Sequence, residues 1–223
     1  MRILHVKKEK IQYTDISKID PGYTDKMDRE YDWMAPGYDL FMILFPMWKS
    51  WIKKVIPHIS GKKVLEVSFG NGYLITKYGV CNDYEISGID YNQKMVAITT
   101  KKIAAKRISA DLLQANVENL PFEDNTFDTI INTMAFTGYP DGDKALAEMK
   151  RVLKNKGKLL IVDFDYPANG NIFGFMLVKL MEKSGDIIKN IGLMLKKHGF
   201  NYQDYPVGGF GSVHLFIGVN LKE

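Results

Sequence analysis

Cysteine is almost missing from this chain of 223 residues, and long apolar runs are missing altogether. The single cysteine, Cys81, excludes an internal disulfide and a cysteine-rich zinc site, and we expect no metal. No run of roughly 18 apolar residues predicts a membrane-spanning helix. Residues 1–7 are too short and too charged for a signal peptide. We therefore predict a cytoplasmic protein without stable membrane insertion.

Internal repeats, low-complexity tracts and a strong charge excess are also lacking. The formal net charge of +4 and the isoelectric point of about 8.9 are explained by ordinary surface charge, so we expect no nucleic-acid partner. A hydrophobic fraction of 46% is typical of globular proteins. We therefore expect the chain to fold around one hydrophobic core, as a monomer or a homodimer.

The chain divides into two parts by composition. Residues 1–60 form an N-terminal appendage: the first thirty or so are polar, and residues 31–59 are apolar and aromatic. That second stretch predicts one or two helices, interrupted near Pro36 and Pro46. Residues 61–223 have the pattern of one α/β domain.

Short apolar strands alternate with helical patterns from residue 62 onwards. The predicted strands are 64–67, 85–90, 112–117, 127–131 and 158–163. Helices are predicted from residue 73, through Met95 to Ile103, and over 143–153, 172–182 and 187–197, before a final antiparallel pair at 200–202 and 212–219. This order predicts a Rossmann-like sheet, mostly parallel with an antiparallel C-terminal strand, and helices on both faces.

Glycines follow the first predicted strand, where an open α/β sheet binds its ligand. Gly70 and Gly72 allow a tight turn into a helix whose free N–H groups attract an anion. A dinucleotide site requires a third glycine, and Ile75 occupies that position. Glu66 also repels a pyrophosphate but favours an ammonium. S-adenosylmethionine (SAM), which carries an ammonium and a carboxylate, is therefore favoured over NAD, and an NAD-dependent oxidoreductase is the weaker alternative.

Asp90 ends the second predicted strand, at the position of the ribose-binding acid in Rossmann-type sites. A carboxylate there accepts both ribose hydroxyl protons. The alternative is a helix N-cap, a role that Asn92 is equally placed to take.

Five ordered segments resemble class I SAM-dependent methyltransferases. They are VLEVSFGNG at 64–72, GIDYNQKM at 88–95, ANVENLPF at 115–122, NTFD at 125–128 and ALAEMKRVLKNKG at 145–157. The resemblance spans about residues 62–163 and implies a methyltransferase fold, SAM as cofactor and S-adenosylhomocysteine as product. It places cofactor contacts at Glu66, Ser68, Gly70, Gly72, Asp90, Tyr91, Asn116, Val117 and Thr133.

Two positions depart from the family pattern. Ser68 stands where the first glycine of the loop is expected, and Asn116 stands where an acid meets the adenine amino group. An amide is able to pair with adenine, with the Val117 N–H beside it. These departures motivate an alternative, a methyltransferase-like protein that binds SAM or S-adenosylhomocysteine without turnover.

Residues 31–39 resemble the N-terminal segment of ubiquinone/menaquinone C-methyltransferases and phospholipid N-methyltransferases. The resemblance implies that this segment covers the cofactor, with Tyr38 in contact; an amphipathic helix packed on the sheet is the alternative. Thr133 lies in NTMAF rather than in the Pro-Pro-aromatic sequence of nucleic-acid amine methylases. A small-molecule or lipid-like acceptor, apolar or aromatic, is therefore expected.

No catalytic triad is visible, and methyl transfer does not require one. Asp165 and Tyr166, after the fifth strand, and His214 in the terminal strand are the candidates for a general base. A lone histidine such as His214 is more often structural than catalytic.

Overall fold

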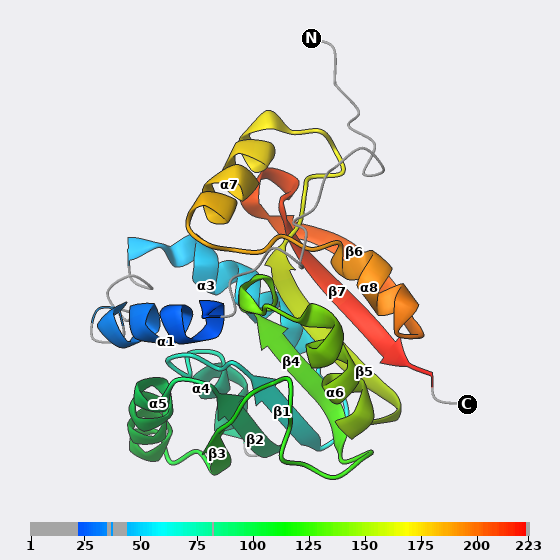
Figure 1. The fold of residues 1–223 in the computed structure, drawn as a ribbon. Coiled ribbons are helices and arrows are strands. Elements are labelled where there is room, and N and C mark those ends of the chain that lie inside the picture. The colour runs from blue at the N-terminus through cyan, green and yellow to red at the C-terminus, as the bar shows by residue number, and fades with distance from the viewer. Residues whose placement is uncertain (1–21, 35–36, 38–43, 82, 222–223) are drawn as a thin grey trace.

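A seven-stranded sheet forms the centre of the molecule, in the computed structural model that describes residues 22–34, 37, 44–81 and 83–221. The strand order is β3-β2-β1-β4-β5-β7-β6 (Figure 1). β3, β2, β1, β4 and β5 pair in parallel, and β7 runs antiparallel to both of its neighbours, β5 and β6. The predicted fold class is confirmed. The strands are β1 (Lys63–Val67), β2 (Glu85–Asp90), β3 (Ala110–Gln114), β4 (Phe127–Thr133), β5 (Leu153–Phe164), β6 (Phe200–Gly208) and β7 (Val213–Asn220).

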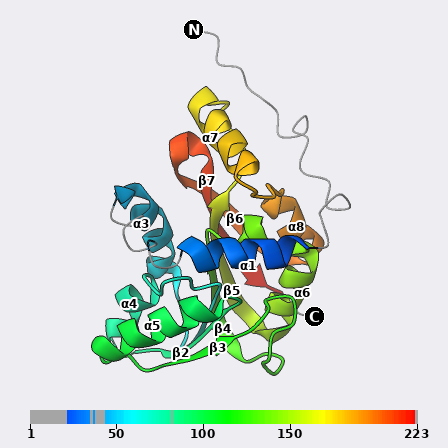
Figure 2. The same ribbon diagram turned by 60° about the vertical axis from the view of Figure 1, so that its left-hand side comes forward.

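Helices connect the strands and cover both faces of the sheet (Figures 1 and 2). The α-helices are α1 (Tyr23–Met34), α3 (Pro46–Ile52), α4 (Ile75–Tyr78), α5 (Gln93–Ala105), α6 (Gly142–Val152), α7 (Ile172–Lys183) and α8 (Ile191–Lys197). Short 3₁₀ helices are η4 (Lys53–His58), η5 (Gly79–Cys81), η6 (Phe136–Gly138) and η7 (Gly209–Gly211). No helix in these described parts of the chain is long and apolar enough to cross a bilayer.

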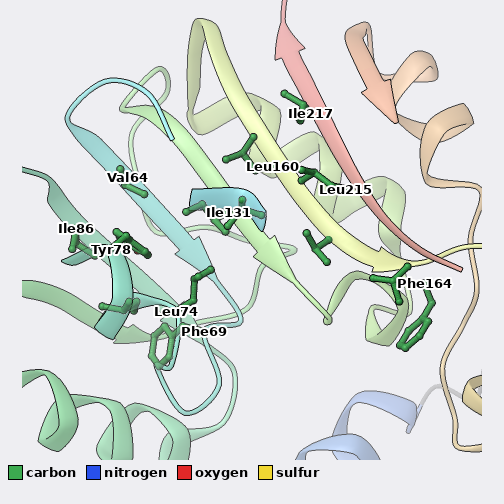
Figure 3. Packing of buried hydrophobic residues seen from close by; sticks show 14 of the residues in the cluster. Val64, Phe69, Leu74, Tyr78, Ile86, Ile131, Leu160, Phe164, Leu215 and Ile217 are labelled. Carbon is green, nitrogen blue, oxygen red and sulfur yellow. The ribbon is translucent and has the colours of Figure 1, made fainter. Parts of the chain in front are cut away.

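Alternation along the central strands produces two cores, one on each face of the sheet. Val64 belongs to the core under α4 and α5, and its neighbour Leu65 belongs to the core under α6 and α8. Figure 3 shows the first of these cores. Central strands that are buried on both faces are continuous in apolar residues, which is why the sequence pattern identifies them.

Several predicted boundaries were wrong, among them that of the last strand pair, where β6 extends to Gly208 instead of residue 202. The third strand is β3 at 110–114, and the chain leaves the sheet before Ala115. The fifth strand begins at Leu153, because the predicted turn at 155–157 is a bulge: Leu153 pairs with Phe127, and pairing resumes at Lys158 with Thr129. The last helix, α8, begins at Ile191, where Asn190 accepts a hydrogen bond from the Leu193 N–H as its N-cap.

The N-terminal part contributes to the main core. Ile52 and Val55, in α3 and η4, are buried, and Val55 packs in the same cluster as Val64. Trp51 lies against Gly208 of β6, where an added Cβ would stand 1.9 Å from the indole Nε1. The hydrophobic core therefore extends across the predicted boundary between residues 60 and 61. α1 also begins earlier than predicted, at Tyr23.

Candidate functional site

A cavity opens at the carboxyl ends of β1, β2, β3 and β4, where parallel α/β sheets bind ligands. It encloses about 1150 Å³, part of which is open to solvent. Predicted cofactor residues that line it are Glu66, Ser68, Gly70, Asp90, Tyr91, Asn116, Val117 and Thr133. The structure therefore brings together residues from the carboxyl ends of four strands and the loops that follow them. Tyr38 lies outside the described residues.

Glu66 is the most unusual group in this cavity. Its side chain is 1% exposed, and its Oε2 atom has no hydrogen-bond partner among the described residues. Burial, opposed by the nearby Tyr78 hydroxyl and reinforced by Asp90, raises the pKa of Glu66 to about 8. A buried acceptor without a partner is costly, and a cationic ligand group would relieve it.

The loop after β1 uses its backbone donors within the protein. Ser68 N–H donates to the Ile89 carbonyl at 2.7 Å, and Gly70 N–H donates to Asp90 Oδ2 at 2.7 Å. Gly72 N–H donates to the Phe69 carbonyl at 3.0 Å. The sequence predicts that backbone N–H groups of the Gly70–Gly72 turn receive a ligand carboxylate; in this structure the N–H groups of Gly70 and Gly72 are hydrogen-bonded within the protein.

The two glycines serve different purposes. Both have positive φ, +55° at Gly70 and +69° at Gly72. A Cβ at Gly70 would meet nothing within 4 Å, whereas one at Gly72 would stand 2.3 Å from Thr99 Cγ2 of α5. Gly70 lines the cavity; Gly72 does not and instead permits α5 to pack closely.

Asp90 organises the loop from the end of β2. It accepts from Gly70 N–H and, at 2.9 Å, from Asn92 N–H. Burial, opposed by these two hydrogen bonds, raises the pKa of Asp90 to about 6. The N-cap of α5 is Asn92, whose Oδ1 accepts from the Met95 N–H at 3.0 Å. The structure therefore gives the capping role to Asn92 and leaves Asp90 facing the cavity.

Asn116 and Val117 follow β3 at the other side of the cavity. Asn116 Oδ1 accepts a hydrogen bond from the Glu118 N–H at 2.9 Å. This contact forms an Asx turn, which fixes the orientation of the Asn116 side-chain amide. Val117 is buried, while Tyr91 is 39% exposed at the rim. These positions suit a planar group held between a polar edge and an apolar wall.

Tyr139 and Asn132, which the sequence did not single out, form a polar cluster with Ser68. The Ser68 and Tyr139 hydroxyls are 2.7 Å apart, and Asn132 Nδ2 donates to the Tyr139 hydroxyl oxygen at 2.6 Å. Ser68 and Tyr139 both line the cavity. No spacing rule predicts this contact, because Ser68 and Tyr139 are 71 residues apart; only the pairing of β1 with β4 brings them together.

Helix α1 lies over the cavity and crosses in front of the sheet in Figure 2. Met27 and Asp28 line the cavity. Asn92 Nδ2 donates to Asp28 Oδ1 at 2.7 Å and to Asp32 Oδ1 at 2.8 Å, and Lys94 pairs with Asp32. These contacts attach α1 to the start of α5, beside the predicted ribose-binding acid.

The three base candidates lie elsewhere, and none lines the cavity. Tyr166 donates to Glu182 Oε1 at 2.6 Å, and its backbone N–H donates to Asp165 Oδ1 at 2.7 Å. His214 is 2% exposed and contacts Asp204 through Nδ1 and the Gly211 carbonyl through Nε2. Their catalytic roles stay predictions.

Comparison with known proteins agrees with this geometry. Residues 18–203 match the model of the ubiE/COQ5 methyltransferase family. The ubiquinone/menaquinone biosynthesis C-methyltransferase of Shewanella piezotolerans is 34% identical over 149 residues, which cover 64% of this chain and 59% of that protein. The corresponding protein of Pasteurella multocida is 31% identical over 169 residues, 70% of this chain and 63% of its own length. The chain thus spans about three fifths of the length of these curated relatives.

Solved structures support the fold. The structure of the complex between the Haloferax volcanii Trm112 methyltransferase activator and a putative methyltransferase matches with a TM-score of 0.70 and 16% identity. That alignment covers 86% of this chain and 98% of the other. At such low identity the likeness establishes the architecture alone.

Proposed function

This chain belongs to the ubiE/COQ5 family of SAM-dependent methyltransferases, and from that premise we propose that it transfers a methyl group from SAM to an apolar ring. The cavity at the carboxyl edge of the sheet is the proposed site. One observation carries the assignment: the carboxyl side chain of Glu66, which is 1% exposed, lines this cavity, where a cationic ligand group would offset the cost of its burial.

The residues present fit the cofactor. Glu66 would hold the ammonium, Asp90 the ribose hydroxyls, and Asn116 with Val117 the adenine edge. Gly70 leaves open space where a side chain would obstruct the ligand. The orphaned carboxyl and the open glycine are features of this chain, independent of the family resemblance.

Bound SAM would supply a methyl group on a positively charged sulfur, already activated for in-line displacement. The chain's own part is to align the acceptor and exclude water. Met27, Trp48, Ile52 and Met134 give the cavity an apolar wall suited to that purpose. Helix α1, attached through Asn92, would close the site.

We further propose a quinone-like acceptor methylated on a ring carbon. The named relatives are C-methyltransferases of ubiquinone and menaquinone biosynthesis. The apolar cavity wall supports an aromatic or lipid-like substrate in place of a charged one.

Calorimetric titration with SAM and S-adenosylhomocysteine, beside Asp90→Ala, tests the assignment. We expect micromolar binding to the wild-type protein and a loss of about 10- to 100-fold in Asp90→Ala, because charge-assisted hydrogen bonds of this kind contribute roughly 1.5–3 kcal/mol. Asp111→Ala, an exposed carboxylate on β3, is the matched control and should bind normally.

Turnover is then measured as S-adenosylhomocysteine formed with hydroquinone and phenol acceptors. Product formation would support the enzyme and remove the non-catalytic alternative. Tight cofactor binding without product from any acceptor would favour a SAM-binding protein without turnover. Absence of binding to the wild-type protein would overturn both.

A further inference from the structure

We propose that the Ser68 hydroxyl, held by Tyr139, donates a hydrogen bond to the carboxylate at the methionine end of the cofactor. This inference rests on the proposed function, because it takes SAM as the ligand. It assigns a ligand-binding role to a side chain at a position where the family pattern has none.

A side-chain donor is needed because the backbone N–H groups of the loop after β1 are already hydrogen-bonded within the protein. Ser68 N–H, Gly70 N–H and Gly72 N–H are all committed to acceptors within the protein, at 2.7, 2.7 and 3.0 Å. Tyr73 N–H is likewise bonded to Asn71 Oδ1 at 3.2 Å. A carboxylate entering this loop therefore meets few unengaged backbone donors, and a side-chain hydroxyl supplies what the turn does not.

Counting protons shows that one hydroxyl hydrogen remains for a ligand. Ser68 and Tyr139 share two hydroxyl protons, and their mutual hydrogen bond uses one. Asn132 donates to the Tyr139 oxygen, which polarises the Tyr139 O–H and favours donation from Tyr139 to Ser68 Oγ. The Ser68 proton is then the one left, and it belongs to a side chain that lines the cavity.

Tyr139 acts as a donor in this arrangement because it keeps its proton. Its side chain is 9% exposed, and burial raises the pKa of its hydroxyl well above the usual value. Tyr139 is therefore a positioning residue for Ser68.

The position of Ser68 fits the ligand. It follows Glu66 by two residues, and the ammonium and carboxylate of an amino acid are attached to the same carbon. Ser68 also has a φ of +55°, a strained value for a residue with a Cβ. Such strain costs on the order of 1 kcal/mol and persists where the surroundings hold it, as Tyr139 does here.

The test compares two ligands and three variants. The ligands are S-adenosylhomocysteine and 5′-methylthioadenosine, which lacks the amino-acid end. The variants are Ser68→Gly, Tyr139→Phe and the double variant. Ser68→Gly keeps the backbone conformation, because glycine accepts positive φ, and it removes the hydroxyl together with its Cβ.

We expect Ser68→Gly to weaken S-adenosylhomocysteine about 10-fold, the effect of one hydrogen bond to a charged group. Binding of 5′-methylthioadenosine should stay within about 2-fold. Tyr139→Phe should show the same ligand selectivity, and adding it to Ser68→Gly should cause no further loss, because Tyr139 acts through Ser68.

Unchanged S-adenosylhomocysteine affinity in Ser68→Gly would overturn the inference, as would equal losses for both ligands. Thermal unfolding of each variant identifies a misfolded Tyr139→Phe, and Ser68→Gly still decides the question in that case. If the wild-type protein binds neither ligand, the proposed function itself fails, which separates the two outcomes.

Discussion

At the scale of single residues, the protonation state of Glu66 couples pH both to protein stability and to cofactor binding. Its folded pKa of about 8 lies above the usual 4.5 because burial disfavours the charged form. Below pH 4.5 the group is neutral in both folded and unfolded states. As the pH rises towards 8, only the unfolded chain releases the proton, so the stability that depends on this group is lost across that window.

Glu66→Gln mimics the neutral carboxyl and removes this titration. We expect the variant to gain stability relative to the wild type between pH 5 and 9, since each unit of pKa shift corresponds to roughly 1.4 kcal/mol. Its cofactor affinity should fall by about 10- to 100-fold, because an amide cannot pair ionically with the ammonium. Thermal unfolding across this pH range and calorimetry measure the two opposite effects.

A proton balance sharpens the same prediction. At pH 6.5, S-adenosylhomocysteine binding to the wild type should release about one more proton than binding to Glu66→Gln, as Glu66 ionises against the ammonium. Calorimetry in buffers of different ionisation enthalpy gives this number. Equal proton release by both proteins would refute the pairing of Glu66 with the ligand ammonium.

At the residue scale, local sequence pattern predicted which side chains lie at the carboxyl edge of the sheet. Glu66 and Asp90 lie at the ends of strands that apolar runs identify, and Gly70 follows the first of these strands, so their place at the sheet edge was predictable. Tyr139 and Asn132 were missed because the contact of Tyr139 with Ser68, which Asn132 supports through the Tyr139 hydroxyl, depends on tertiary pairing.

At the scale of elements, α1 depends on a few polar contacts at the start of α5. Asn92→Asp would keep the N-cap, since Asp and Asn cap helices about equally well. It would also replace the shared donor with a third carboxylate beside Asp28 and Asp32. We expect α1 to detach, faster hydrogen exchange over residues 23–34, and a rise of about 10-fold in the dissociation rate of S-adenosylhomocysteine, from a lost contact of roughly 1.5 kcal/mol.

A second substitution makes this prediction specific. Asp28→Asn in the Asn92→Asp background exchanges donor and acceptor and should restore slow dissociation in stopped-flow measurements. If the dissociation rate is the same in all three proteins, α1 does not cover the bound cofactor.

Predicted element boundaries were wrong where the same sequence pattern fits two local structures equally well. Residues 155–157 read as a turn, and the structure shows a bulge within β5, with Lys156 at a φ of 64°. A tight turn and a bulge use the same backbone conformation, so sequence alone does not distinguish them. The helical pattern over 187–197 included Ile187 and Ile188. These two residues are apolar because they are buried in the loop before α8, and not because they belong to a helix.

At the scale of the whole molecule, the question is whether residues 44–60 unfold with the sheet. The chain's three tryptophans, Trp33, Trp48 and Trp51, all precede residue 61. Trp33 is 85% exposed, so it reports little. Trp48 lies 5.9 Å from the Phe164 ring of β5, and Trp51 packs on Gly208 of β6. Tryptophan fluorescence therefore reports the N-terminal helices, while circular dichroism reports the molecule as a whole.

We expect the two signals to give one coincident unfolding transition in Trp33→Phe, because α3 and η4 share the core of the sheet. Adding Gly208→Ala should displace both transitions together by about 1–3 kcal/mol, since its Cβ would overlap the Trp51 ring and overpacking has that typical cost. Were residues 1–60 a separate appendage, fluorescence would change at lower denaturant than circular dichroism. Gly208→Ala would then widen the gap between the two signals, because loss of the Trp51 contact would release the N-terminal helices before the sheet.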